Sequence, residues 1–377
     1  MQPNARRHWL ALNLRAAGLC ALGAAPLWPV AAQALPQRTL QFPRDHGSHP
    51  GLRTEWWYIT GHALAAGRLL GFQLTFFRSR VDGTQNLQSA FAAKQLLFAH
   101  AAVTDVQGAR LLHDQRIARA GFGVARASEA DTDIRLQDWS LVRTELAGSP
   151  VQGASAGSRY RARTAGSGFA LDLQFDTTQP TLLQGQQGLS RKGPDADQAS
   201  YYYSEPQLSV RGTIMVGTER MAVREGSGRA WLDHEWSEAL LHPEAVGWDW
   251  IGMNLHDGSA LTAFRLRRAD GTALWAGGSL RPPGGVARIF DAASVTFTPE
   301  RWWTSPLSGA RYPVQWRVRT PAGQFQVRPL LDSQELDSTG STGAIYWEGL
   351  SDLLDAAGQP AGRGYLEMTG YAKPLRL

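Results

Sequence analysis

Alternation of hydrophobic and polar residues is the feature that most limits how this chain can fold. Phe72, Leu74 and Phe76 alternate with polar neighbours, and the same spacing recurs over residues 169–175 and 314–318. Because successive side chains of a β-strand point to opposite faces, such segments bury one face only. Forty glycines and twenty prolines further favour short strands joined by turns over helices.

Turn pairs separate many of the strand-like segments. They include Asp82-Gly83, Asp257-Gly258, Asp270-Gly271 and Ala322-Gly323, which suit the tight connections of antiparallel hairpins. The sequence therefore predicts an all-β fold of antiparallel β-barrels. Only residues 85–97, where three apolar side chains are loosely spaced along one side, are predicted to be helical.

The length predicts two domains, because a chain of this size exceeds one ordinary hydrophobic core. Trp56–Ile59 and Trp248–Ile251 each precede a turn and a second strand-like segment, which indicates two barrels of similar plan in tandem. Chance similarity of two aromatic hairpins is the alternative. Small residues at Gly226-Ser227-Gly228 mark the expected boundary, which gives domains over residues 35–227 and 228–377.

The N-terminus has the features of a secretory leader. Arg6 and Arg7 precede an apolar stretch, and Ala32-Gln33-Ala34 supplies the small residues that signal peptidase accepts. The paired arginines also fit a twin-arginine signal. A membrane anchor is the alternative, but prolines interrupt the stretch, which is shorter than the roughly 20 residues of a spanning helix. We therefore expect a signal peptide over residues 1–34 and a periplasmic or secreted protein without a transmembrane span.

Removal of this leader changes the charge and the cysteine content. It removes three of the 38 basic residues and no acidic one, which leaves 35 against 33 and a net charge of +2. Such a balance gives no indication of a nucleic-acid partner. Cys20, the only cysteine, also lies in the leader, so the mature chain is expected to lack disulfides, thiolate nucleophiles and cysteine metal sites.

Aromatic and ionisable residues concentrate in a few segments. These segments are Glu55–Tyr58, Ser200–Glu205, Trp231–Trp236 and Gly247–Trp250. Ionisable groups seldom crowd an otherwise apolar strand without a pairing or functional role. A site is therefore predicted there, with packing in the core as the alternative for the tryptophans.

The segment from Trp231 to Trp236 is the densest of these. If it is a strand, His234 and Trp236 project from one face, while Trp231, Asp233 and Glu235 project from the other. In an apolar barrel lumen the pKa of a carboxyl rises and that of an imidazole falls, so both groups could exchange protons near neutral pH.

The following segment extends the candidate site. Trp248 and Trp250 would share a face opposite Asp249, and indole faces can stabilise a cation through the ring quadrupole. Residues 233–235 are consecutive on a strand and cannot all face one ion, so no metal is predicted. The sequence has no Gly-x-Ser-x-Gly nucleophile elbow, phosphate loop or dinucleotide fingerprint, so neither a serine hydrolase nor a cofactor is expected.

Several of these segments together carry a family resemblance. They are residues 46–62 (HGSHPGLRTEWWYITGH), 72–78, 98–100, 183–204, 231–237 (WLDHEWS), 247–252 (GWDWIG), 346–349 and 370–371. From about Phe42 to the C-terminus the chain resembles the secreted AttH-like proteins, in the superfamily of bacterial carotenoid 1,2-hydratases. The resemblance implies two lipocalin-like barrels, and members are often encoded beside ABC-transporter permeases of the lipoprotein-release type.

The resemblance also implies roles for individual residues. In the hydratase branch a histidine and a tryptophan two residues on, matching His234 and Trp236, take part in protonation of an isoprenoid double bond before water adds. That branch also uses a tyrosine and an aspartate on a following strand, where residues 261–266 here read LTAFRL. Asp249 or Glu235 would have to replace the missing proton donor.

Two functional hypotheses follow. The first is an exported protein that binds an isoprenoid or lipid and acts on it by acid–base hydration, or by hydrolysis without a serine triad. Its catalytic candidates are His234, Asp233, Glu235 and Asp249. Its ligand-binding candidates are Trp236, Trp248, Trp250, Tyr202, Tyr203, Glu55, Trp57 and His100. The second is a non-catalytic lipid carrier or accessory protein of an ABC-type envelope transporter.

Overall fold

The computed structural model describes residues 34–147 and 157–375. These residues form strands, turns and three 3-10 helices, namely η1 (Arg44–His46), η2 (Asp82–Thr84) and η3 (Ala292–Ser294), and they contain no α-helix. No helix in this part of the chain has the length and hydropathy to cross a membrane. The predicted all-β fold is therefore confirmed, while residues 1–33 of the expected signal peptide lie outside the described residues.

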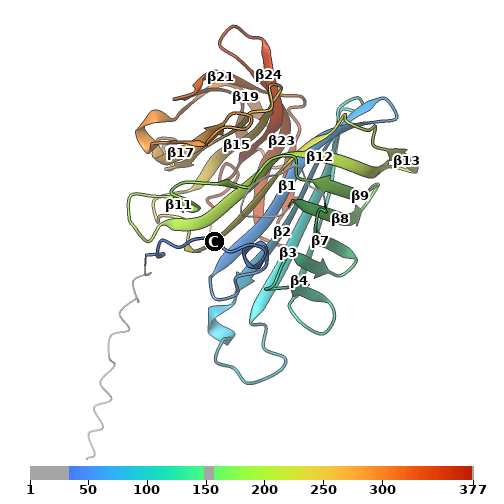
Figure 1. Cartoon of the computed structure of the whole chain (residues 1–377), viewed down its shortest axis with the longest axis vertical. Helices are drawn as coiled ribbons and strands as arrows, with labels where there is room; N and C mark the ends of the chain where they lie inside the picture. The colour runs from blue at the N-terminus through green and yellow to red at the C-terminus, as the bar shows by residue number, and fades with distance from the viewer. Residues whose placement is uncertain (1–33, 148–156, 376–377) are drawn as a thin grey trace, which may run out of the picture. The chain divides into compact units, whose positions relative to one another are not determined.

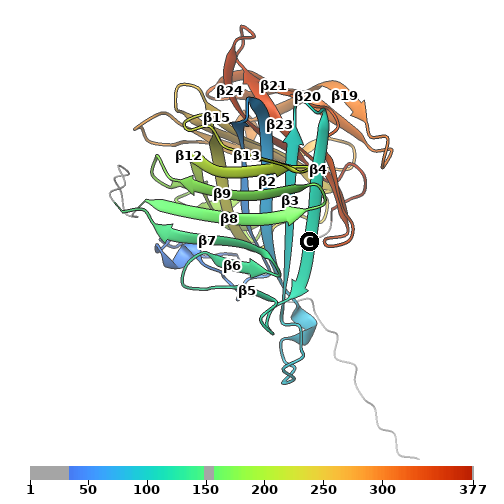
Figure 2. The ribbon, with the colours of Figure 1, turned by 90° about the vertical axis from the view of Figure 1, so that its right-hand side faces the viewer.

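The first sheet contains fourteen of the described strands (Figures 1 and 2). They are β1 (Thr54–Ala65), β2 (Arg68–Arg80), β3 (Gln95–Asp105), β4 (Arg110–Arg119), β5 (Ala125–Ala127), β6 (Asp133–Leu136), β7 (Trp139–Glu145), β8 (Ser158–Gly166), β9 (Phe169–Asp176), β10 (Leu182–Leu183), β11 (Leu189–Arg191), β12 (Ala199–Val216), β13 (Glu219–Ala222) and β14 (Arg229–Ala239). The main path runs β4-β3-β2-β1-β14-β12-β9-β8-β7-β6-β5, with every pair antiparallel.

This sheet curls into a nearly closed barrel. Figure 2 shows β5 to β9 running across the direction of β2 to β4. The Arg116 guanidinium of β4 donates to the Ala165 carbonyl of β8 and lies over the Trp139 ring of β7. Side chains thus join the edge strand β4 to β7 and β8, around a core that includes Phe72, Tyr160 and Trp236.

The second sheet contains ten of the described strands. They are β15 (Gly247–Leu255), β16 (Ala260–Arg267), β17 (Ala273–Arg281), β18 (Arg288–Phe290), β19 (Thr296–Thr304), β20 (Arg311–Thr320), β21 (Gly323–Pro329), β22 (Glu335–Ser338), β23 (Ala344–Leu354) and β24 (Pro360–Met368). Their order is β18-β17-β16-β15-β24-β23-β21-β20-β19, with β22 beside β23. Trp316, Trp347 and Tyr312 fill their own core.

The two sheets share one plan. In the first, β1 lies between β2 and β14, the last strand of that sheet along the chain. In the second, β15 lies between β16 and β24, which is again the last strand. The sequence similarity between Trp56–Ile59 and Trp248–Ile251 therefore marks equivalent strands of a tandem, lipocalin-like architecture.

Strand pairing divides the chain at a later position than the glycine-rich segment indicated. Gly226–Gly228 only joins β13 to β14, and β14 pairs with both β1 and β12 of the first sheet. The first sheet therefore extends to Ala239, and the second begins at Gly247. Asp257-Gly258, Asp270-Gly271 and Ala322-Gly323 do occupy hairpin connections, as predicted.

The helix predicted over residues 85–97 is wrong. Residues 85–94 connect η2 to β3, and β3 begins at Gln95 and pairs with β2 and β4 along its length. The run from Leu96 to Val103 is apolar at nearly every position, so it shows no strand alternation. Both faces of β3 are covered, which explains that pattern: Ala99 and Val103 belong to the core of the first barrel, and Ala102 packs with Leu336 and Tyr346 of the second sheet.

Direct contacts join the two sheets into one compact unit over Gln33–Leu377. A separate apolar cluster with members from both sheets includes Tyr58, Trp231, Trp250, Leu350 and Tyr365. A Cβ atom at Gly71 of β2 would lie 2.7 Å from the Tyr365 hydroxyl oxygen and 3.1 Å from Leu350 Cβ. Glycine therefore allows β2 to approach the second sheet closely at this point.

Candidate functional site

Strand β14 presents different chemistry on its two faces, as the alternation predicted. Trp57 of β1 and Tyr203 of β12 lie opposite His234, so all three face the interior of the first barrel. Tyr58 and Ser204 lie opposite Asp233 and face the second sheet. The structure therefore separates His234 from Asp233 and Glu235, which the catalytic hypothesis had grouped together.

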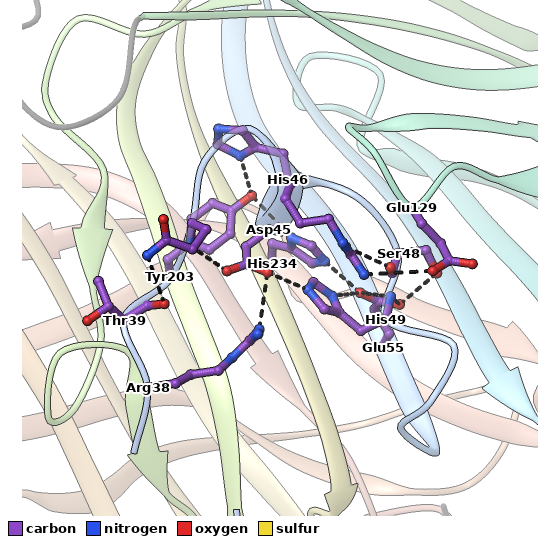
Figure 3. Close-up of polar contacts among 12 residues, drawn as sticks. Arg38, Thr39, Asp45, His46, Ser48, His49, Glu55, Glu129, Tyr203 and His234 are labelled. Atoms are coloured by element: carbon purple, nitrogen blue, oxygen red, sulfur yellow. Dashed lines mark hydrogen bonds and ion pairs between the residues drawn. The ribbon is translucent and has the colours of Figure 1, made fainter. Parts of the chain in front are cut away.

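His234 belongs to a buried polar network inside the first barrel (Figure 3). Glu55 is its centre: Oε1 lies 3.0 Å from His234 Nε2 and 2.7 Å from His49 Nδ1, while Oε2 accepts from Arg78 Nε at 2.8 Å and from Ser48 Oγ at 3.0 Å. His234 and Glu55 are 0% and 1% exposed. Trp57 stacks on the His234 ring.

The hydrogen bonds of this network limit which nitrogens of its imidazoles can donate and which can accept. His49 faces a carboxylate at each nitrogen, Glu55 at Nδ1 and Asp45 at Nε2, so both nitrogens donate only when the ring is protonated. Burial lowers the pKa of His234 to about 4, although its hydrogen bond to Glu55 opposes this. A neutral His234 that donates from Nε2 to Glu55 accepts at Nδ1 from the Tyr203 hydroxyl, 3.1 Å away.

The Tyr203 hydroxyl extends this hydrogen-bond network to a second imidazole, that of His46. Its oxygen lies 2.7 Å from His46 Nδ1, and burial lowers the pKa of His46 well below its usual value. His46, Tyr203, His234 and Glu55 thus form a continuous row of hydrogen bonds. Among the described residues, His46 Nε2 has no partner at the end of this row.

His49, Glu55 and His234 also bring three metal-ligating atoms within 4.8 Å of one another. The Arg78 guanidinium, however, is ion-paired with the same carboxylate and is itself buried. A divalent cation there would lie beside this fixed positive charge and would displace the hydrogen bonds of both imidazoles. The donor set therefore fits a charge-balanced hydrogen-bond network better than a metal centre.

The opposite face of β14 borders a cavity of about 470 Å³ between the two sheets. Aromatic side chains from both sheets, among them Trp56, Phe77, Trp248 and Phe264, form much of its wall. At its rim the cavity reaches the exposed residues Lys373 and Pro374. This size and lining suit a small apolar ligand.

Asp233 is the acid of β14 that lines this cavity without a cationic partner among the described residues. Its carboxyl is 4% exposed and accepts hydrogen bonds from Ser204 Oγ at 2.5 Å, Tyr202 Oη at 2.7 Å and Trp231 Nε1 at 2.7 Å. Burial raises the pKa of Asp233 to about 7, against the lowering effect of these donors. Both protonation states are therefore accessible at neutral pH.

Glu235 lies next to Asp233 on the same face but is paired differently. Lys192 Nζ lies 2.9 Å from Glu235 Oε1, and the Ser200 hydroxyl donates to the same oxygen. Lys192 also lies over the rings of Tyr202 and Phe264, 4.5 and 4.4 Å from their centroids. Glu235 is thus held as the partner of the only lysine that the described structure buries in the cavity wall.

Asp249 lies away from the other catalytic candidates. As the alternation predicted, it faces the opposite side of β15 from Trp248 and Trp250. On that side of the second sheet it accepts from Arg265 Nε at 2.7 Å and from the Tyr371 hydroxyl at 2.8 Å. It does not line the cavity.

The ligand-binding candidates divide between the two faces in the same way. Tyr202, Trp248, Trp250 and His100 line the cavity. Trp57, Tyr203, Trp236 and the carboxylate of Glu55 belong to the network inside the first barrel. His100 also links the sheets, since its Nδ1 lies 2.8 Å from the Tyr346 hydroxyl oxygen of β23.

Sequence reasoning missed several ionisable residues of the cavity, among them Lys192, Glu348 and Glu367. Glu348 and Glu367 are cross-strand partners on β23 and β24. Each is the only acidic residue in its segment, 346–350 or 364–369, and a lone acid among mostly apolar residues is a weaker form of the signal that pointed to the crowded ionisable residues 233–235. That signal could have identified both glutamates, but not their position opposite β14.

Comparisons with known proteins agree with this architecture. A crystal structure of an AttH-type protein from Nitrosomonas europaea is 47% identical, covers 90% of this chain and 99% of its own, and superposes with a TM-score of 0.80. Kievitone hydratase from Nectria haematococca shares the fold at 13% identity, with coverages of 89% and 94% and a TM-score of 0.68. CghA, solved with Sch210972, does so at 13% identity, with coverages of 84% and 88% and a TM-score of 0.52.

A sequence search of curated proteins gives no match. The sequence model of the family described as AttH-like, in contrast, matches residues 33–371, which is nearly the whole chain. The chain belongs to the AttH-like family.

Proposed function

We propose that the cavity between the sheets binds an apolar small molecule, such as an isoprenoid or lipid, and that Asp233 transfers a proton to it in a hydration reaction. The observation that carries this proposal is the buried Asp233 carboxyl, with a pKa of about 7, in the wall of an aromatic cavity of about 470 Å³. The fold shared with kievitone hydratase supports the reaction class by analogy.

The proposed reaction uses the chain's own groups. The protonated Asp233 donates its proton to a carbon–carbon double bond, and the carbocation that forms lies against the faces of Trp250 and Trp56. Water then adds to the cation, and its released proton returns to the Asp233 carboxylate. The Tyr202 hydroxyl, which is bonded to Asp233 and 3.3 Å from Trp250 Nε1, holds the carboxyl in orientation.

Incubation with isoprenoid and unsaturated lipid candidates, followed by mass spectrometry of solvent extracts, tests the reaction. Asp233→Asn should lower the formation of a product heavier by one water by a factor on the order of 10² to 10⁴ while retaining ligand binding. Asp257→Asn, in the exposed β15–β16 turn, is the control. Turnover of the Asp233→Asn variant at the wild-type rate would refute the assignment.

A non-catalytic carrier is the second candidate function. It is favoured by the position of His234, which matches the hydratase branch in sequence but lies across β14 from the cavity. A carrier would release bound lipid unmodified, and it would bind with equal affinity after Asp233→Asn. Its partner would be a permease of the ABC-transporter type, which co-purification from envelope membranes tests.

We also propose that the protein acts outside the cytoplasm, in the periplasm or the medium, after removal of residues 1–34. The Arg6-Arg7 pair and the Ala32-Gln33-Ala34 sequence support this. N-terminal sequencing of the protein from a periplasmic fraction should begin at Leu35. An intact N-terminus on protein confined to the cytoplasm would contradict the proposal.

A further inference from the structure

Two carboxyl groups lie side by side on neighbouring strands in the cavity wall, and neither has an ion-pair partner among the described residues. Glu348 and Glu367 are register partners on β23 and β24, and both line the cavity. Glu348 is 2% exposed, and among the described residues its Oε1 has no hydrogen-bond partner. An unpartnered buried carboxyl oxygen is costly unless a ligand or a proton satisfies it.

The groups around this pair do not neutralise it. Burial raises the pKa of Glu348 well above its usual value, and the charge of Glu367 raises it further, while the Tyr58 hydroxyl lowers it. Burial likewise raises the pKa of Glu367. The Trp248 indole lowers it, and the charges of Asp233 and Glu235 raise it. Tyr346 and Tyr365 also face Glu348. His100, bonded to Tyr346, is neutral because burial lowers its pKa to about 3.

The basic residues in the cavity wall are paired with other acids or lie at the exposed rim, so they do not neutralise Glu348 and Glu367. Lys192 is bonded to Glu235, and Lys373 is exposed at the rim. Five acids line the cavity, namely Glu55, Asp233, Glu235, Glu348 and Glu367, against two buried cations, Arg78 and Lys192. Arg78 is paired with Glu55 and Lys192 with Glu235. Among the described residues, Asp233, Glu348 and Glu367 therefore have no cationic partner. Such an excess of carboxyls beside indole and phenol rings is the composition that recognises ammonium groups.

We propose that Glu348 and Glu367 bind the ammonium group of a cationic amphiphile, whose apolar chain occupies the aromatic part of the cavity. This inference rests on the proposed function, because it names the ligand class of the same cavity. Without the ligand, a proton on one of the two carboxyls takes the place of the ammonium. Binding of the cation releases that proton, and the orphan oxygen of Glu348 then gains a charged partner.

The pH dependence of binding follows from this exchange. Burial raises the pKa of Glu367 to about 7, and that of Asp233 to about 7 as well. The affinity for a permanently charged ammonium should therefore rise as the pH rises through 7, because the carboxylate is the binding form. For one such group the expected gain between pH 6 and pH 8 is about tenfold.

The experiment compares two probes of equal chain length, decyltrimethylammonium and 1-decanol, below the concentration at which micelles form. Titration is followed by tryptophan fluorescence, which Trp248 and Trp250 in the cavity wall should report. Decyltrimethylammonium should bind at least tenfold more tightly than decanol at pH 8. Glu367→Gln and Glu348→Gln should abolish this preference without weakening decanol binding, whereas the exposed Glu219→Gln should preserve it.

The outcomes separate this inference from the proposed function. Equal affinities for the two probes would overturn the ammonium site and leave binding of apolar ligands intact. Failure of both probes to bind would count against the cavity as an apolar ligand site. If the glutamine variants do not fold, the wild type alone tests the inference. The ratio of its affinities for decyltrimethylammonium and 1-decanol should rise from pH 6 to pH 8, and a constant ratio would overturn the inference.

Discussion

Replacement of Glu55 by glutamine tests whether the network inside the first barrel holds the fold together. The substitution removes a charge that is 1% exposed and ion-paired with Arg78, itself 2% exposed. It also places an amide donor among groups that already donate, including His49, His234 and Ser48. Breaking one side of a buried ion pair typically costs about 3–5 kcal/mol, so we expect a loss of that size in the free energy of unfolding.

Urea-induced unfolding, followed by the fluorescence of the 14 tryptophans, measures this loss. Glu219→Gln is the matched control, because Glu219 is ion-paired with Arg68 at 3.1 Å but its side chain is 55% exposed. Such a surface pair contributes about 0–1 kcal/mol. If Glu55→Gln costs no more than this control, the network does not stabilise the fold and the reasoning fails.

The pH dependence of the same variant supplies a second check. Burial alone would raise the pKa of Glu55, but the hydrogen bonds from His234 and His49 outweigh it and hold the pKa well below its usual value. A depressed carboxyl pKa contributes stability above the unfolded-state pKa, about 4.5, and this contribution is lost as the pH falls below that value. The difference between wild type and Glu55→Gln should therefore narrow from pH 6 to pH 3.

Two further substitutions test the buried glutamate of β12 and the contact between the sheets. Burial raises the pKa of Glu205 to about 7, so the wild type loses stability as the pH rises from about 4.5 to 7. In urea unfolding, Glu205→Gln should therefore gain about 2.5 kcal/mol relative to wild type between pH 5 and pH 8; a constant difference would contradict this. Gly71→Ala should destabilise by about 1–3 kcal/mol through contact with Tyr365 and Leu350, whereas Gly51→Ala, where a Cβ meets nothing within 4 Å, should be nearly neutral.

The sequence pattern predicted local structure well where strands have one buried face. It identified the hairpins around Asp257-Gly258 and Asp270-Gly271 and the opposite faces of Asp233 and His234, because both depend on neighbours along the chain. It failed at β3, since a strand covered on both sides loses the alternation that identifies it. The chain's length and its repeated aromatic hairpin were enough to predict the tandem plan.

The composition of the site could not be predicted in the same way. Glu348 and Glu367 reach Asp233 only because the second sheet packs on the first, and no local pattern encodes that packing. The hypothesis that grouped His234 with Asp233 and Glu235 treated neighbours in sequence as neighbours in space. On a strand buried on both faces, adjacent residues instead belong to different environments.

The two faces of β14 are nevertheless coupled through the strand itself. The hydrogen bonds of Glu55 with Arg78 and His234 tie together β2, β1 and β14 from inside the barrel, which fixes the register that sets Asp233 opposite Tyr58. Tyr202 and Tyr203 on β12 divide in the same manner, one bonded to Asp233 and the other to His234. The inner carboxylate of Glu55 is thus paired with Arg78, whereas Asp233 on the outer face has no cationic partner among the described residues. Because burial raises the pKa of Asp233 to about 7, its carboxyl can hold or release a proton at neutral pH.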